Sequence, residues 1–110
     1  MNLENKKCVP CEVGGKALES NEIAIFAEDL KDWEVIESKK LTRQFKFKDF
    51  KESMDFVNKV AEMADREGHH PDIHISYNKV NLELTTHAVK GLTENDFIIV
   101  SKIEKIWYKE

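Results

Sequence analysis

The sequence has no apolar run long enough to cross a membrane. It also contains few residues of the types that cross-link a chain or break its helices and strands. Among its 110 residues are two cysteines, two prolines and four glycines. Apolar runs such as Phe97 to Val100 fall far short of the roughly 20 residues that a membrane-spanning helix needs. The first seven residues also lack the apolar stretch of a signal peptide. We therefore expect a cytoplasmic protein with no membrane partner.

An excess of basic residues is also missing. The formal net charge is −4, whereas affinity for nucleic acid comes largely from Lys and Arg side chains that neutralise phosphates. We therefore expect no direct nucleic-acid partner. With 41% hydrophobic and 35% charged residues, the composition is that of one globular domain. We expect this domain to span residues 20–110, after a tail of residues 1–19.

The tail carries a lone Cys-x-x-Cys motif, formed by Cys8 and Cys11. A structural zinc site needs four ligands, and a thioredoxin-like redox motif needs a preceding strand and a following helix. Neither context is present, so we interpret the pair as an incidental, reduced part of the tail. Zinc binding by cysteines of two chains in an oligomer stays open.

Hydrophobic periodicity predicts helices and strands in the order α-β-β-α-β-β-α. Gly68 is suited to end the long second helix, and Pro71 prevents that helix from resuming. The pattern predicts an α+β fold, in which a four-stranded antiparallel sheet carries three helices on one face and leaves the other face open. A second apolar flank on the long helix, Phe56, Val60 and Met63, suggests more than one packing partner. The expected helices are residues 20–30, with Ser20 or Asn21 as the cap, 49–67 and 93–108, and the expected strands are 33–36, 41–47, 72–77 and 80–84.

The last two strands are expected to form a hairpin with Asn78 and Lys79 as its loop. Ile75 then faces Leu82 and Ile73 faces Leu84 on one apolar face, while His74 faces Glu83 on the open face. Extended further, the same register places His70 opposite His87. A metal site is a poor fit, because four residues of strand separate His70 from His74 by about 13 Å. Histidines that flank one ligand fit general acid–base catalysis better, since histidine gives and takes protons near neutral pH.

Four separate blocks of sequence resemble the pterin-4a-carbinolamine dehydratases. They are Gly68-His69-His70-Pro71, Tyr77-Asn78-Lys79-Val80, Thr85-Thr86-His87 and the residues from Gly91 to Asp96. The resemblance implies a hydro-lyase that dehydrates a 4a-hydroxytetrahydropterin (4a-carbinolamine) to the quinonoid dihydropterin during tetrahydropterin recycling. It implies a pterin as substrate, and neither a metal nor a redox cofactor.

The resemblance also implies which residues form the site. His69, His70 and His87 match the family's three active-site histidines, and we expect His69 and His87 to be the acid–base pair and His70 to orient the substrate. Gly68, Thr85, Thr86 and Ala88 match positions that line the pterin. Asp96 matches an acidic residue near the site, but with Thr93 as N-cap it can equally complete a capping box at the start of the last helix. Gly68 and Ile73 replace an acidic residue and a tryptophan of animal members, so the preferred pterin is open.

Family members assemble as homodimers or homotetramers, so the resemblance implies a homo-oligomer that serves an aromatic amino acid hydroxylase pathway. The alternative is a non-catalytic pterin-binding or regulatory dimerisation subunit on the same fold, linked to a hydroxylase or to molybdopterin metabolism. His69 is one residue out of step with His70 in an extended strand. We therefore expect Gly68 and Pro71 to bend the chain and turn His69 toward the other two histidines.

Overall fold

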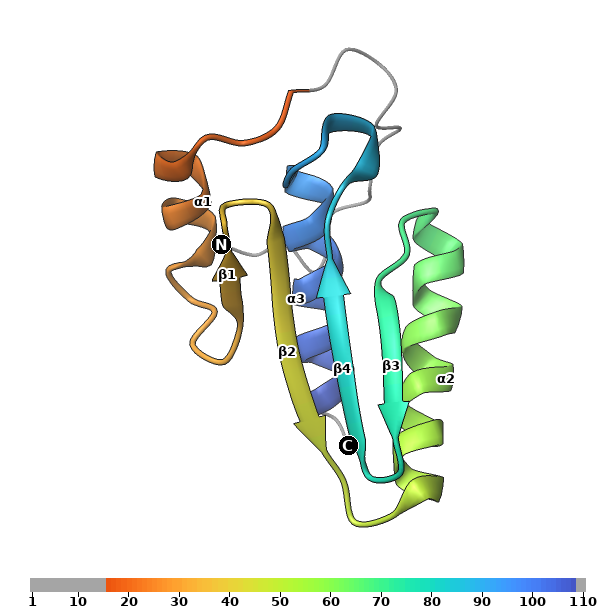
Figure 1. Cartoon of the computed structure of the whole chain (residues 1–110). Coiled ribbons are helices and arrows are strands. Elements are labelled where there is room, and N and C mark those ends of the chain that lie inside the picture. Colours follow the sequence, from red (N-terminus) through yellow and green to blue (C-terminus); the bar gives the residue numbers. More distant parts are fainter. Residues whose placement is uncertain (1–15, 109–110) are drawn as a thin grey trace.

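The computed structural model describes residues 16–108, so the Cys8 and Cys11 pair and most of the expected tail lie outside the described residues. The described chain has the predicted order of helices and strands (Figure 1). A short 3₁₀ turn, His87–Val89, is added before the last helix. The helices are α1 Ser20–Ala27, α2 Phe50–Glu67 and α3 Glu94–Tyr108, and the strands are β1 Glu34–Ile36, β2 Lys40–Lys46, β3 Asp72–Ser76 and β4 Lys79–Leu84.

The strands form one antiparallel sheet in the order β1-β2-β4-β3. Leu41 and Phe45 of β2 and Leu82 of β4 are buried on the face that the helices cover, where α3 lies behind β2 and β4 in Figure 1. The opposite face is open, and His74, Asn81 and Gln44 form one exposed row across it. The predicted fold class, with one apolar and one open sheet face, is therefore confirmed.

Local hydrogen bonds define both ends of α2. The Asp49 side chain accepts from the Glu52 backbone N–H at 3.0 Å, and the Glu52 carboxylate accepts from the Lys48 N–H at 3.0 Å. These bonds satisfy amide groups that lack partners within the helix. Gly68 ends the helix with φ of 68°, a left-handed conformation that costs glycine little. The chain therefore turns sharply just before His69, as the sequence predicts.

The first helix differs from its prediction at both ends. Its N-cap is Glu19, not Ser20 or Asn21, and the Glu19 N–H donates to the Glu22 carboxylate at 2.9 Å. The helix ends at Ala27, not at residue 30. Tight turns follow, with bonds from Leu30 N to Ala27 O and from Trp33 N to Leu30 O. They bring Trp33 into the core, where it is 7% exposed, so tertiary packing has overridden the helical periodicity.

The predicted register of the β3–β4 hairpin is wrong by two residues. Ile75 faces Val80, Ile73 faces Leu82, and Tyr77 and Asn78 form the loop. Two hydrogen bonds fix Asn78 to Phe47, the residue that follows β2. The Asn78 side-chain amide donates to Phe47 O at 3.2 Å, and the Asn78 backbone carbonyl accepts from Phe47 N at 2.8 Å. A shift of two keeps every side chain on its face, so the hydrophobic pattern is satisfied in both registers.

Because the register differs, two contacts predicted from it are not formed. His74 faces Asn81 and not Glu83, and the ladder between β3 and β4 begins at Asp72. His70 precedes the ladder, and His87 lies beyond β4 in the 3₁₀ turn. The prediction that these two histidines face each other across paired strands is therefore wrong.

The second flank of α2 packs inside the same protomer. Phe56, Val60 and Met63 are buried among the core side chains. The large apolar side chain that remains open on this helix is Phe50, which is 49% exposed. These three side chains therefore pack α2 onto the sheet and α3 of the same protomer. The surface that α2 presents to solvent is formed by other residues, among them Phe50.

Arg43 places a charge on the covered face of β2. Its side chain is 10% exposed and its Nη1 lies 2.6 Å from the Glu104 carboxylate of α3. The guanidinium also lies over the ring of Phe45, 4.4 Å from the centroid. The guanidinium also lies 5.6 Å from the ring centroid of Trp107 in α3. The ion pair and this second ring contact connect the last helix to the centre of the sheet. Within residues 16–108, no helix combines the length and apolar character needed to cross a membrane.

Candidate active site

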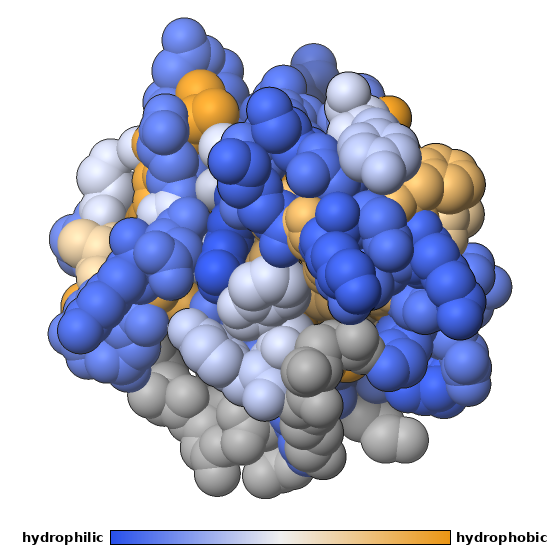
Figure 2. All heavy atoms as spheres, turned by 90° about the horizontal axis from the view of Figure 1, so that it is seen from below, coloured by the Kyte–Doolittle hydropathy of each residue, from blue (hydrophilic) through white to orange (hydrophobic). Residues whose placement is uncertain are grey.

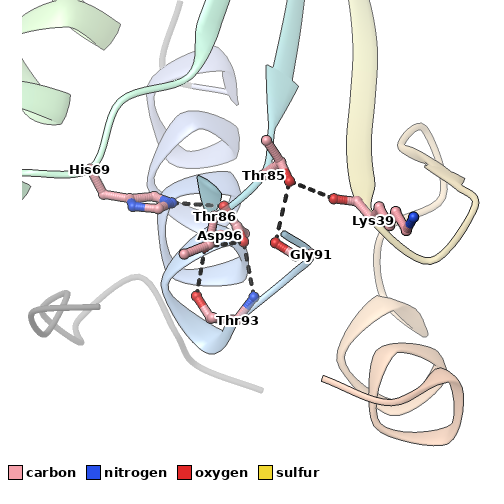
Figure 3. Close-up of polar contacts among 7 residues, drawn as sticks. All are labelled: Lys39, His69, Thr85, Thr86, Gly91, Thr93 and Asp96. Carbon is pink, nitrogen blue, oxygen red and sulfur yellow. Dashed lines mark hydrogen bonds and ion pairs between the residues drawn. The ribbon is translucent and has the colours of Figure 1, made fainter. Parts of the chain in front are cut away.

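The turn after α2 directs His69 onto the first turn of α3. The His69 Nε2 lies 2.7 Å from Asp96 Oδ1, and the two side chains are 11% and 0% exposed (Figure 3). An ionised carboxylate only accepts hydrogen bonds, so we infer that the proton in this contact belongs to His69 Nε2. The expected bend at Gly68 is thus present, and it turns His69 toward a buried carboxylate.

Asp96 serves the helix and the histidine together. Its Oδ2 accepts from the Thr93 backbone N–H at 2.9 Å, which confirms the predicted capping role. The same oxygen accepts from the Thr86 hydroxyl at 2.7 Å, and the Thr86 and Thr93 hydroxyls are 2.9 Å apart. The contact between His69 and Asp96 spans 27 residues of sequence, and the prediction of a cap gave no sign of it.

His70 turns to a different partner. Its Nε2 lies 2.9 Å from Oδ1 of Asp65 in the last turn of α2, and the two side chains are 59% and 81% exposed. Asp65 is missing from the residues predicted for the site. Its position five residues before His70, on the far side of a helix-ending glycine, is the only signal that could have suggested the pair.

His87 begins the 3₁₀ turn and is exposed, as is Ala88. This turn directly follows Thr86, whose backbone is bridged to Gly91 by bonds of 2.8 and 3.4 Å. His69 therefore contacts Asp96, Asp96 contacts Thr86, and His87 is the next residue in the chain. In the structure His69 contacts the buried carboxylate of Asp96 directly, His87 follows Thr86, a second partner of that carboxylate, and His70 contacts Asp65 of α2.

The two threonines use their hydroxyls within the protein. The Thr85 hydroxyl lies 2.7 Å from Lys39 O and 3.2 Å from Gly91 O, and Thr86 is 2% exposed with its hydroxyl engaged as described (Figure 3). The hydroxyl protons are thus engaged within the protein, so a pterin contact by these residues would use their backbone, their methyl groups or the acceptor lone pairs of the Thr85 hydroxyl. Gly68 is exposed, with open space where a β-carbon would stand.

The start of the described chain runs beside this loop. Leu18 N donates to Leu92 O at 2.7 Å, just before α3. A β-carbon built on Gly91 would lie 2.8 Å from the Ala17 β-carbon, closer than real β-carbons approach. Glycine at position 91 therefore lets the segment of Ala17 and Leu18 pack directly against the loop that follows His87.

Elsewhere in the described residues, the features to consider are metal-binding groups and hollows that could hold a ligand. Among residues 16–108, no three His, Cys, Asp or Glu side chains are grouped closely enough to hold a metal ion. A hollow of about 600 Å³ lies at the other end of α3, lined by aromatic rings, lysines and carboxylates. The surface at that end is mostly hydrophilic, with apolar groups in separate patches (Figure 2). The hollow contains none of the histidines; its lining is Lys46, Phe47, Lys48, Glu52, Asp55, Trp107 and Tyr108.

Comparison with known proteins identifies relatives along almost the whole chain. A protein of Rickettsia canadensis is 47% identical over 103 residues, covering 93% of this chain and 94% of the relative. A protein of Alkaliphilus metalliredigens is 44% identical over 105 residues, covering 94% and 95%. Both are named, provisionally, as pterin-4-alpha-carbinolamine dehydratases.

A solved structure agrees with these relatives. The crystal structure of a transcriptional coactivator/pterin dehydratase from Brucella melitensis has a TM-score of 0.78 and 33% identity, covering 83% of this chain and 98% of its own. The family model described as Pterin 4 alpha carbinolamine dehydratase matches residues 16–106. The chain therefore belongs to the pterin 4 alpha carbinolamine dehydratase family.

Proposed function

We propose that this protein dehydrates a 4a-hydroxytetrahydropterin to the quinonoid dihydropterin. In this reaction the bond from C4a to the hydroxyl oxygen breaks, and N5 loses its proton as the double bond between C4a and N5 forms. An acid must protonate the departing hydroxyl so that it leaves as water, and a base must accept the N5 proton. The reaction is balanced without a metal or a redox cofactor.

His69 and His87 are the acid–base pair in this proposal, and His70 orients the substrate. The observation that carries the proposal is the link through one buried carboxylate: Asp96 holds His69, and Thr86, which also contacts Asp96, directly precedes the exposed His87. Imidazoles supply both an acid and a base near neutral pH, an effect worth roughly 10² to 10⁴ in rate. Gly68 and Ala88 are both exposed, and nothing lies within 4 Å of the place where a Gly68 β-carbon would stand.

The direct test follows the ultraviolet absorbance of a freshly generated 4a-carbinolamine. Purified protein should accelerate its decay, and His87→Ala should remove most of the acceleration. His74→Ala is a matched control, because His74 is exposed on the open sheet face. Dialysis against a chelator should leave the rate unchanged. The proposal would be refuted if the carbinolamine decayed no faster with wild-type protein than in buffer alone.

A non-catalytic role is the second candidate. The Brucella melitensis relative is described both as a transcriptional coactivator and as a pterin dehydratase, so the fold is associated with regulation as well as catalysis. In that case the protein binds a stable pterin or a partner protein without accelerating the dehydration. Pterin binding measured by calorimetry, together with no effect on carbinolamine decay, would favour it.

We also propose that the protein is a homodimer or a homotetramer. β3 is an edge strand whose outer backbone groups are free to pair. Ile75 in this strand is 40% exposed and Tyr77 just after it is 63% exposed. Light scattering should give two or four times the mass of one chain, and Ile75→Lys should shift the population toward the monomer; a wild-type monomer would contradict the proposal.

A further inference from the structure

The buried carboxylate of Asp96 is held in one orientation by donors on both of its oxygens. Oδ2 receives the Thr86 hydroxyl at 2.7 Å and the Thr93 N–H at 2.9 Å, and Oδ1 faces His69 Nε2 at 2.7 Å. Asp96 is 0% exposed and Thr86 is 2% exposed. Water therefore has little access to replace any of these donors if one is removed.

The direction of each hydrogen bond follows from the number of protons. A threonine hydroxyl has one proton, and the ionised carboxylate of Asp96 can only accept. Thr86 therefore donates to Asp96, so the 2.9 Å contact between the hydroxyls requires Thr93 to donate to Thr86. The chain of donors runs from Thr93 through Thr86 to Asp96 and leaves Oδ1 as the acceptor for His69.

We propose that Thr86 is a positioning residue that, through Asp96, keeps the proton of His69 on Nε2 and leaves Nδ1 as the nitrogen that meets the substrate. Its effect on rate rests on the dehydration proposed above, whereas the position of the proton does not. With Nε2 engaged by Asp96, Nδ1 is the ring nitrogen left to exchange a proton with a ligand. Thr86 thereby orients the reactive edge of a ring that it does not itself touch.

Thr86 also connects His69 with His87. Its side chain acts on His69 through Asp96, while its backbone pairs with Gly91 to close the loop that begins with His87. One residue thus fixes the ring orientation of His69 and the starting point of the turn that carries His87. Thr93 shares the hydroxyl network but has no such link to His87.

The test compares Thr86→Val, which keeps the shape and removes the hydroxyl, with Thr86→Ser, which keeps the hydroxyl. Two-bond ¹H–¹⁵N correlation spectra of the free protein, recorded at alkaline pH where histidine side chains are neutral, identify the protonated ring nitrogen. Wild type and Thr86→Ser should show His69 with the proton on Nε2. Thr86→Val leaves Oδ2 with the Thr93 N–H but without the Thr86 hydroxyl, so the carboxylate can rotate away from His69, and the His69 ring should then show a mixture of the two neutral forms. Thr42→Val removes a threonine hydroxyl from β2 on the open face, and it should leave the His69 signals unchanged.

The kinetic arm separates positioning from general loss of structure. Thr86→Val should lower kcat about tenfold, with a smaller change in KM, by analogy with the roughly 10- to 100-fold losses that follow removal of partners that orient metal-ligating histidines. Thr86→Ser should restore most of kcat. If Thr86→Val does not fold, Thr86→Ala provides the same comparison.

Two results would overturn the inference. One is a wild-type His69 with its proton on Nδ1, and the other is a folded Thr86→Val or Thr86→Ala variant whose His69 signals match wild type. A protein inactive on the carbinolamine whose His69 signals still respond to Thr86→Val would refute the dehydration and leave the positioning role intact.

Discussion

Asp96→Asn is the substitution for which the structure gives the most definite expectation. The amide has nearly the shape of the carboxylate, but it offers one acceptor and one donor group. The Thr86 hydroxyl and the Thr93 N–H both point at the Oδ2 position, so the amide oxygen should occupy it. In the reverse orientation the Thr86 hydroxyl could turn to the Thr93 hydroxyl, but the part-buried Thr93 N–H would face the amide NH₂ without an acceptor, at about 1–3 kcal/mol.

The amide NH₂ must then face His69 Nε2, which lies 2.7 Å from the oxygen being replaced. Nε2 becomes the acceptor and the proton moves to Nδ1, so the substrate meets a nitrogen without a free lone pair. In the serine-protease triad a corresponding Asp-to-Asn change lowers kcat by about 10⁴. General acid–base catalysis contributes roughly 10² to 10⁴ in rate, and we expect a loss within that range here.

The assay measures initial rates of 4a-carbinolamine decay for wild type, Asp96→Asn and Asp72→Asn, with circular dichroism to confirm folding. Asp72 is exposed on the open face beside Glu83 and is the control for removing one negative charge. Asp96→Asn should be slow, with the His69 proton on Nδ1, and Asp72→Asn should match wild type. An Asp96→Asn protein that is folded and within threefold of wild-type rate would show that the Asp96 contact does not control catalysis.

Three further predictions concern stability and pH. Gly91→Ala should cost about 1–3 kcal/mol of unfolding free energy by urea titration, because its β-carbon meets Ala17. Adding Ala17→Gly should recover most of this loss, and no recovery would count against the close contact. Arg43→Met should cost about 2–3 kcal/mol, since it leaves the Glu104 carboxylate, whose side chain is 19% exposed, without its partner. Arg43→Met with Glu104→Leu should be more stable than Arg43→Met alone, and additive losses would argue against a coupled pair. The dehydration rate should be bell-shaped in pH between about 5 and 8, where histidine ionises, and a flat profile would exclude the histidine pair.

The sequence predicts the elements of this fold well because their signals are local. Asp49 and Gly68 mark the ends of α2 by capping chemistry that needs only neighbouring residues. Alternating apolar residues also predict the covered face of the sheet correctly. The register of the hairpin is not predicted, because a shift of two residues leaves that alternation unchanged. The deciding contact, between Asn78 and Phe47, joins residues 31 apart in the sequence.

The site divides in the same way. Asp96 is predicted as a cap because its partner Thr93 is three residues away. Its contacts with His69 and Thr86 depend on how α3 packs beside the ends of β3 and β4, which no local pattern encodes. The residues of the site could therefore be named from the resemblance, whereas their pairing as His69 with Asp96 and His70 with Asp65 could not.

The double use of Asp96 turns the start of α3 into a reporter for the histidine site. Its Oδ2 holds the Thr93 N–H, and its Oδ1 faces His69. A ligand that exchanges a proton with the His69 ring changes the charge on that ring and therefore the electron density of the Asp96 carboxylate. The Thr93 N–H donates to this carboxylate, so its hydrogen bond changes as well. The amide resonance and hydrogen-exchange rate of Thr93 should therefore register occupancy of a site that Thr93 does not itself line, without a label being added to the protein.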